Sequence, residues 1–164
     1  MNKKNRVYWD ACTWIAYLNQ EKEVERSDGS SENWFRMCDQ VLRSAKEERL
    51  EIATSAFTLA EVCKPPQVKE IGLDKLSLSF EQPYIFLLPV DAFIGRQAQH
   101  IQLSEPGIKP ADAIHLASAQ RAKATELHTF DGKLLGLGER MLHPDGTPLK
   151  ICKPTQGQPE GPLI

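Results

Sequence analysis

Four acidic residues are spaced so that a folded chain could gather their carboxylates into one site. Asp10 follows a short run of β-branched and aromatic residues, Asp112 lies two residues after Pro110, and Glu61 and Asp131 fall in two other segments. Carboxylates held close together repel one another unless a cation is bound. Oxygen ligands without a matching set of His or Cys favour Mg²⁺ or Mn²⁺ over zinc. The sequence therefore predicts a Mg²⁺ or Mn²⁺ site, provided that the fold brings the four acids together.

The segment Ile108–Ala119 is the most informative of the four. Pro110 followed by an unbroken run of helix formers places Asp112 in the first turn of a helix, where backbone N–H groups are unpaired and negative charge is favoured. Taken alone, Asp112 is best interpreted as a residue that complements the helix dipole. Only the arrival of other acids at the same place favours a metal ligand.

The chain alternates short apolar strands with amphipathic helices. Strands are predicted over 6–9, 50–54, 84–88, 125–129 and 149–152. Helices are predicted over 12–19, from Ser30 or Ser31 to 48, from 55 to 64 with Glu61 near the middle, and over 67–80, 91–103 and 110–123. The charged residues over 20–31 are predicted to form a solvated helix end and a mobile loop, and a turn is predicted over 130–132.

This order predicts the α/β class, as a three-layer α/β/α sandwich with a mainly parallel central sheet. Sites in such sheets form at the carboxyl ends of strands, beside the switch in strand order. Asp10 and Asp131 each follow a predicted strand. Glu61 lies on the helix after the second strand, and Asp112 opens a helix. We therefore expect the four acids at one edge of the sheet.

Length and composition favour one globular domain. The chain has 164 residues, 41% of them hydrophobic, and we expect a single domain over 1–152 and a disordered tail over 153–164. A net charge of −2 gives no global positive field, so any nucleic-acid binding must come from a local site. The cysteines form no C-x-x-C pair, which argues against a disulfide framework and fits a cytoplasmic protein. No segment has the apolar length of a membrane span.

Four short motifs, in this order along the chain, resemble those of the PIN domain family. They are Val7–Thr13, Thr58–Val62, Pro110–Ala117 and His128–Asp131, and the resemblance spans about residues 5 to 152. It implies a metal-dependent ribonuclease that acts on RNA, of the kind found as the toxin of toxin–antitoxin pairs. It also implies that Asp10, Glu61 and Asp112 are the three core acids, that Asp131 is a more variable fourth, and that Thr129 supports the site.

One departure from the family concerns the second position after the first acid. The family often has a small hydroxyl or amide residue there, whereas this chain has Cys12, followed by Thr13. A thiol is a weak hydrogen-bond partner, which predicts weak support of Asp10 from Cys12. A cognate antitoxin and a homodimer are both left open by the sequence.

Several other residues have two interpretations. His115 lies one turn beyond Asp112, where it could touch substrate or water, but a packed helix histidine is the favoured interpretation. The same holds for four lysines that could contact phosphate but are better interpreted as ordinary surface charges, namely Lys64, Lys109, Lys123 and Lys133.

Two other classes of protein compete with a nuclease. A phosphoacceptor receiver domain is also α/β with acids at strand ends, but it pairs acids after its first strand and places a lysine after its last, and neither pattern is present. A non-catalytic PIN-like module that binds RNA or protein would keep the fold without the chemistry. The presence of all four acids counts against such a loss of activity.

Overall fold

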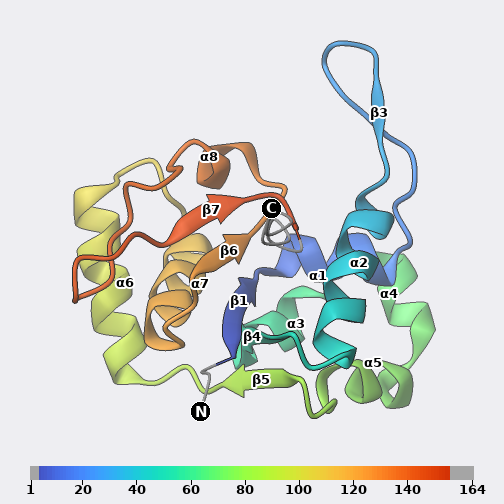
Figure 1. Cartoon of the computed structure of the whole chain (residues 1–164), viewed down its shortest axis with the longest axis horizontal. Helices are drawn as coiled ribbons and strands as arrows, with labels where there is room; N and C mark the ends of the chain where they lie inside the picture. The colour runs from blue at the N-terminus through green and yellow to red at the C-terminus, as the bar shows by residue number, and fades with distance from the viewer. Residues whose placement is uncertain (1–3, 156–164) are drawn as a thin grey trace, which may run out of the picture.

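A five-stranded parallel sheet separates two layers of helices (Figure 1). The structure is a computed structural model and describes residues 4–155, so most of the predicted tail lies outside the described residues. The strand order is β5-β4-β1-β6-β7, and all four pairings in this sheet are parallel. The strands are β1 (Asn5–Trp9), β4 (Leu50–Ser55), β5 (Ile85–Leu88), β6 (Glu126–His128) and β7 (Lys150–Cys152). The predicted α/β sandwich is confirmed.

Successive residues of β1 point to opposite faces of the sheet, as the pleat of a strand requires. Val7 and Trp9 pack into one hydrophobic cluster, and Tyr8 packs into the other. Helices on the Trp9 face are α1 (Ala11–Leu18), α2 (Trp34–Lys46), α4 (Pro66–Ile71) and α5 (Leu73–Phe80), and those on the Tyr8 face are α6 (Ala92–Ser104), α7 (Pro110–Arg121) and α8 (Gly132–Leu135). Among the described residues, no helix combines the length and apolar character needed to cross a membrane.

The strand order reverses direction at β1. From β1 the chain builds outward through β4 to β5, and it then returns to add β6 and β7 on the other side of β1. Trp9 pairs with His128, so the residues that follow β1 and β6 emerge side by side. A switch of this kind opens a crevice at the carboxyl ends of the strands. The fold therefore places Asp10 beside the Thr129–Asp131 segment.

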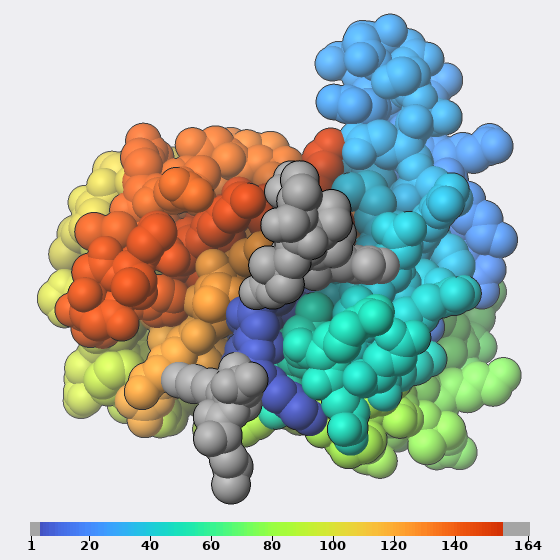
Figure 2. Space-filling model, viewed as in Figure 1, coloured from blue at the N-terminus to red at the C-terminus, as the bar shows by residue number. Residues whose placement is uncertain are grey.

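The segment predicted as a loop over 20–31 is partly ordered as a hairpin. Its strands are β2 (Val24–Glu25) and β3 (Ser31–Glu32), and it projects from the body of the molecule (Figures 1 and 2). Gly29 supplies the turn with a φ of 84°, and the Asp28 carboxylate accepts a hydrogen bond from the Ser30 amide at 2.9 Å. The prediction of a helix end and a loop missed this hairpin, in which the turn residues close a short antiparallel pair.

The helices differ from the prediction in four places. Helix α2 begins after Asn33, whose side chain accepts from the Arg36 amide at 2.8 Å and caps the helix in place of Ser30 or Ser31. The single helix predicted over 67–80 is two helices, because Gly72 has a φ of 87°.

The other two differences lie near the acids. Glu61 is the last residue of α3 (Ala56–Glu61), not near its middle, because the helix stops before Pro65 and Pro66. Where only a turn was predicted, Asp131 caps α8.

We expect Leu127→Ala to lower the free energy of unfolding by about 2 to 5 kcal/mol, because Leu127 of β6 is fully buried against the helices of the Tyr8 face. Leu103→Ala is the matched control, since Leu103 of α6 is 82% exposed, and its effect should stay within about 0.5 kcal/mol. Urea denaturation of the two variants measures the difference. Equal losses would contradict the assignment of Leu127 to the core.

Candidate metal centre

Four carboxylates surround one cleft at the carboxyl end of β1. The cleft has a volume of about 150 Å³, and it is lined by Asp10, Glu61, Asp112 and Asp131 together with Ala11, Cys12, Ile15, Lys64 and His115. Each acid comes from a different element. Asp10 caps α1, Glu61 ends α3, Asp112 lies in the first turn of α7, and Asp131 caps α8. The expected convergence of the four acids is observed.

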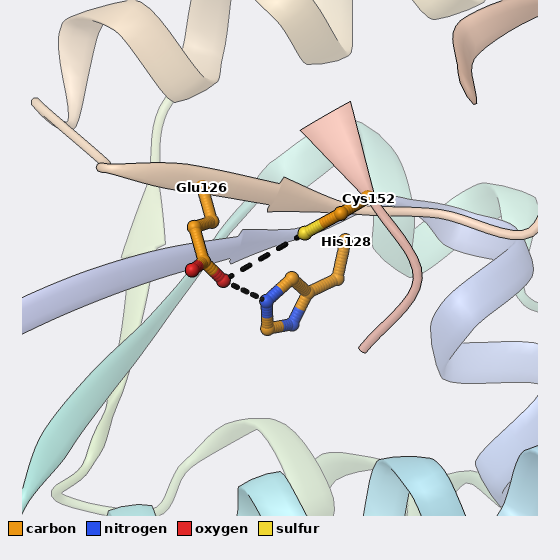
Figure 3. Close-up of side chains that lie close together, drawn as sticks. All are labelled: Glu126, His128 and Cys152. Atoms are coloured by element: carbon orange, nitrogen blue, oxygen red, sulfur yellow. Dashed lines mark hydrogen bonds and ion pairs between the residues drawn. The ribbon is translucent and has the colours of Figure 1, made fainter. Parts of the chain in front are cut away.

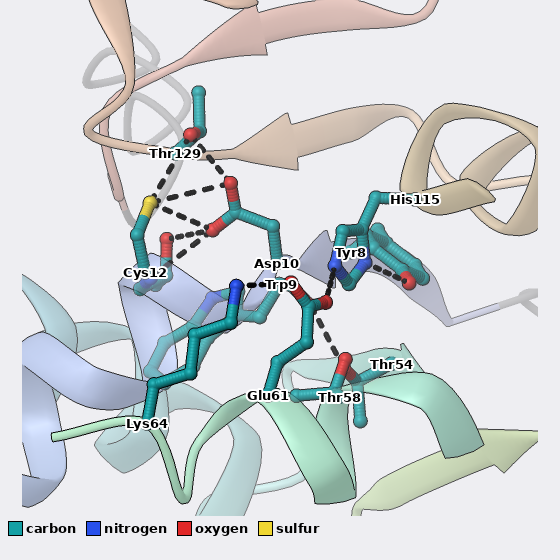
Figure 4. A network of polar contacts seen from close by, with 11 residues as sticks. Tyr8, Trp9, Asp10, Cys12, Thr54, Thr58, Glu61, Lys64, His115 and Thr129 are labelled. Atoms are coloured by element: carbon teal, nitrogen blue, oxygen red, sulfur yellow. Dashed lines mark hydrogen bonds and ion pairs between the residues drawn. The ribbon is translucent and has the colours of Figure 1, made fainter. Parts of the chain in front are cut away.

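Asp10 is held by donors on both of its carboxylate oxygens (Figure 4). Oδ1 accepts from the Thr13 amide at 3.0 Å and lies 2.9 Å from the Thr13 hydroxyl. Oδ2 accepts from the Thr129 hydroxyl at 2.5 Å. The Cys12 thiol lies 3.1 and 3.3 Å from the two oxygens. Since Asp10 is only 3% exposed, these donors replace the water that an ionised carboxylate would otherwise bind.

Thr129 connects two of the acids. Its hydroxyl donates to Asp10 and accepts from the Asp131 amide at 3.1 Å. The Asp131 carboxylate in turn accepts from the amides of Lys133 and Leu134 at 2.9 and 3.0 Å, which caps α8. A single buried hydroxyl thus fixes the spacing between Asp10 and Asp131. The residue two positions after Asp10 offers only a thiol, and Thr13 and Thr129 supply the hydroxyl contacts instead.

Burial and the neighbouring acids raise the pKa of Asp112. Burial is the largest cause of the increase, followed by the negative charges of Asp131 and Asp10. Asp112 lies at the N-terminal end of α7, with Pro110 in the first turn, and this end of a helix favours a carboxylate. Burial and repulsion together leave the pKa of Asp112 raised, and a bound cation would lower it.

His115 is a residue of the cleft whose main contact could not be foreseen. Its Nε2 lies 2.5 Å from Glu61 Oε1, and its Nδ1 lies 2.8 Å from the hydroxyl of Tyr8. The histidine is 1% exposed, which agrees with the favoured interpretation as a packed helix residue. The signal in the sequence was its spacing of three from Asp112, which places both side chains on neighbouring parts of one helix face.

The candidate phosphate-binding lysines lie in different places. Lys64 lines the cleft, with its Nζ 3.7 Å from Glu61 Oε2 and a side chain that is 74% exposed. Lys123 lies at the other end of the sheet from the acids, near the amino end of β6. There it lines a larger groove of about 880 Å³ together with Thr125. That groove is the larger hollow, but it has none of the four acids in its lining. The four acids therefore line the smaller cleft and not this groove.

Glu126, His128 and Cys152 form a second group of metal-type side chains on β6 and β7 (Figure 3). His128 Nδ1 accepts from the Trp9 indole at 3.1 Å, so Nε2 carries the proton and donates to Glu126 at 2.8 Å. Burial raises the pKa of Cys152 to about 12, which keeps the thiol protonated. A metal would need a lone pair on Nε2 and a thiolate. In this arrangement the cluster is therefore a hydrogen-bonded network, not a metal site.

The acidic cleft, in contrast, fits a hard divalent cation. Its lining offers carboxylate oxygens, which Mg²⁺ and Mn²⁺ prefer. Burial, and after it the nearby charges of Asp131 and Asp10, raises the pKa of Asp112, and a bound cation would oppose this increase. His115 is turned to Glu61 through Nε2 and to Tyr8 through Nδ1, so neither ring nitrogen is free to ligate. The donor set is thus one of oxygens.

The chain belongs to the PIN domain family, since the family model matches residues 7–139. Among solved structures it is similar to the toxin VapC20 from Mycobacterium tuberculosis, described as cleaving the sarcin-ricin loop. The two share 15% sequence identity and a TM-score of 0.55, over 77% of this chain and 90% of that one. A toxin–antitoxin complex from Klebsiella pneumoniae gives 20% identity and a TM-score of 0.49, over 77% and 88%. At 15% identity, the likeness to VapC20 shows a common fold. No curated protein sequence matches the chain.

In the presence of EDTA, we expect Asp112→Asn to raise the melting temperature at pH 7 by a few degrees. The folded-state pKa of Asp112 is raised, so the ionised carboxylate destabilises the metal-free protein as the pH rises above the ordinary aspartate range. The gain should therefore shrink as the pH falls and the wild-type carboxyl takes up its proton. Thermal melts across this range measure it.

The matched control is Asp74→Asn, which removes an exposed acid from the first turn of α5. It should leave the melting temperature unchanged or slightly lowered, because that carboxylate only complements the helix dipole. A destabilised Asp112→Asn variant at pH 7 would contradict the repulsion that we assign to the cleft.

Proposed function

We propose that this chain is a metal-dependent endoribonuclease that hydrolyses RNA phosphodiester bonds at the acidic cleft. One nuclease domain over 1–152 would carry the activity. The observation that carries the proposal is the meeting of four carboxylates from four separate elements at the carboxyl end of β1. Membership of the PIN domain family supports it. Asp10, Glu61, Asp112 and Asp131 are the proposed metal-binding and catalytic residues, with Thr129 in support.

Each acid has a role that follows from its surroundings. Asp10, Asp112 and Asp131 would hold one or two Mg²⁺ or Mn²⁺ ions. Glu61 has Oε1 occupied by His115, which leaves Oε2 on the side of Lys64 to ligate or to orient the attacking water. When bound, the ion lowers the pKa of water and stabilises charge on the phosphate. Lys64 is exposed at the rim of the cleft, where it can meet an RNA phosphate.

The biological setting that we propose is a toxin–antitoxin pair. The fold is that of VapC20, a toxin described as cleaving the sarcin-ricin loop, and it supports RNA as the substrate and a cognate antitoxin as a partner. The cysteines Cys12, Cys38, Cys63 and Cys152 are all free, which fits a cytoplasmic protein. A homodimer remains an expectation from the sequence.

The second candidate function is a non-catalytic PIN-like module that binds RNA or protein. It would keep the sheet and the helices without needing a cation. Calorimetric titration with Mn²⁺ separates the two, because the nuclease requires an ion in the cleft and the binding module does not.

Asp10→Asn should reduce Mn²⁺-dependent cleavage of a defined RNA panel by roughly 100-fold or more, because the amide cannot replace the negative charge toward the metal. The fold should persist, since asparagine is also a good N-cap and can still accept from the Thr13 amide. Cleavage is measured with Mn²⁺ and with EDTA, and EDTA should abolish it.

Asp91→Asn is the matched control. Asp91 also caps a helix, α6, by accepting from the Ile94 amide at 3.0 Å, but it is outside the lining of the acidic cleft. This variant should cleave like the wild type. Full activity in Asp10→Asn, or cleavage that survives EDTA, would overturn the proposed mechanism.

A further inference from the structure

We infer that Tyr8 and His115 are positioning residues that hold the Glu61 carboxylate toward the metal centre. The inference rests on the proposed function and adds two residues to it. Three elements contribute, because Tyr8 lies on β1, Glu61 ends α3 and His115 lies on α7. Figure 4 shows the three side chains in a row, with the histidine ring between the phenol and the carboxylate.

Burial makes this chain of contacts rigid. Tyr8 is fully buried, His115 is 1% exposed and Glu61 is 8% exposed. In such surroundings an unpaired polar atom is costly, so each group is expected to keep its partner. The Tyr8 and His115 rings also pack together, with centroids 5.8 Å apart. The histidine has little freedom to turn away from Glu61.

The tautomer of His115 follows from the state of the phenol. A phenol keeps its proton at neutral pH. The Tyr8 hydroxyl can therefore donate to His115 Nδ1, 2.8 Å away. An imidazole that accepts through Nδ1 carries its proton on Nε2, which then donates to Glu61 Oε1. The direction of donation thus runs from Tyr8 through His115 to the carboxylate.

This arrangement distinguishes the two oxygens of Glu61. Oε1 is engaged by His115, and Oε2 lies 3.7 Å from Lys64 on the side of the cleft. The same contact fixes α3 relative to α7, on which Asp112 lies one turn before His115. Glu61 and Asp112 are thereby held at a constant spacing. Groups behind a metal ligand commonly affect metal affinity in this way.

Tyr8→Phe tests the inference, because it removes one hydroxyl that is outside the lining of the cleft. We expect Mn²⁺ affinity, measured by calorimetry, to fall roughly tenfold. Tyr17→Phe is the matched control, since the Tyr17 ring stacks on Phe35 and is also outside the cleft lining, and its affinity should match that of the wild type. Unchanged affinity in Tyr8→Phe would overturn the inference.

A double-mutant cycle separates positioning from a merely structural role. In a Glu61→Gln background the loss caused by Tyr8→Phe should disappear, because the carboxylate that it positions is gone. A tenfold loss that persists in this background would overturn the inference. His115→Gln, which can still donate an N–H to Glu61, should retain more Mn²⁺ affinity than His115→Leu. Equal affinities of these two variants would also count against it.

A measurement without metal keeps the two proposals distinguishable. Nitrogen chemical shifts of the His115 ring report which nitrogen carries the proton, and the Nε2–H form is expected in the wild type. An Nδ1–H form would overturn the inference whatever the activity. If the Nε2–H form is present but the wild type binds no Mn²⁺, the hydrogen bonds from Tyr8 through His115 to Glu61 are supported and the proposed nuclease function fails.

Discussion

The cleft depends on holding carboxylates close together against their mutual repulsion. Asp10 tolerates near-complete burial because hydroxyl, amide and thiol groups donate to both of its oxygens. Asp112 has no comparable set among the contacts of the described residues, and its pKa is raised. The protein thus compensates only part of the negative charge of the site. A bound cation would complete the compensation, and metal binding would then be linked to the stability of this end of the sheet.

Because β1 lies at the centre of the sheet, its last residues and Asp10 contact both helical layers and the acidic cleft. Tyr8 faces α7 and contacts His115, Trp9 faces the opposite layer and donates to His128, and Asp10 leaves the strand into the cleft. Three consecutive residues therefore connect both helical layers to the acids. The neighbouring strands add Thr129 from one side, and on the other side the Thr54 hydroxyl donates to the Trp9 carbonyl at 2.8 Å. The site is built on the most constrained part of the sheet.

The alternation of apolar residues and the strand–helix order were sufficient to predict the sheet, its parallel character and the edge at which the acids meet. Local turn chemistry was the main source of error, as at Asn33 and Gly72, where a cap and a positive φ moved helix boundaries by a few residues. The contact of His115 with Glu61 joins residues 54 positions apart and has no periodic signal. It depends on how α3 and α7 approach each other, which is a property of the packed fold.

The alternation along β1 also limits how the chain can change in length. Deleting one residue from Asn5–Trp9 would exchange the faces of the residues before it, or shift Asp10 relative to Thr129. The β2–β3 hairpin stands clear of the sheet, so residues added at its tip near Gly29 leave the strand register intact. The hairpin can therefore vary in length without disturbing the acidic cleft. The first strand cannot, because its length sets the position of Asp10.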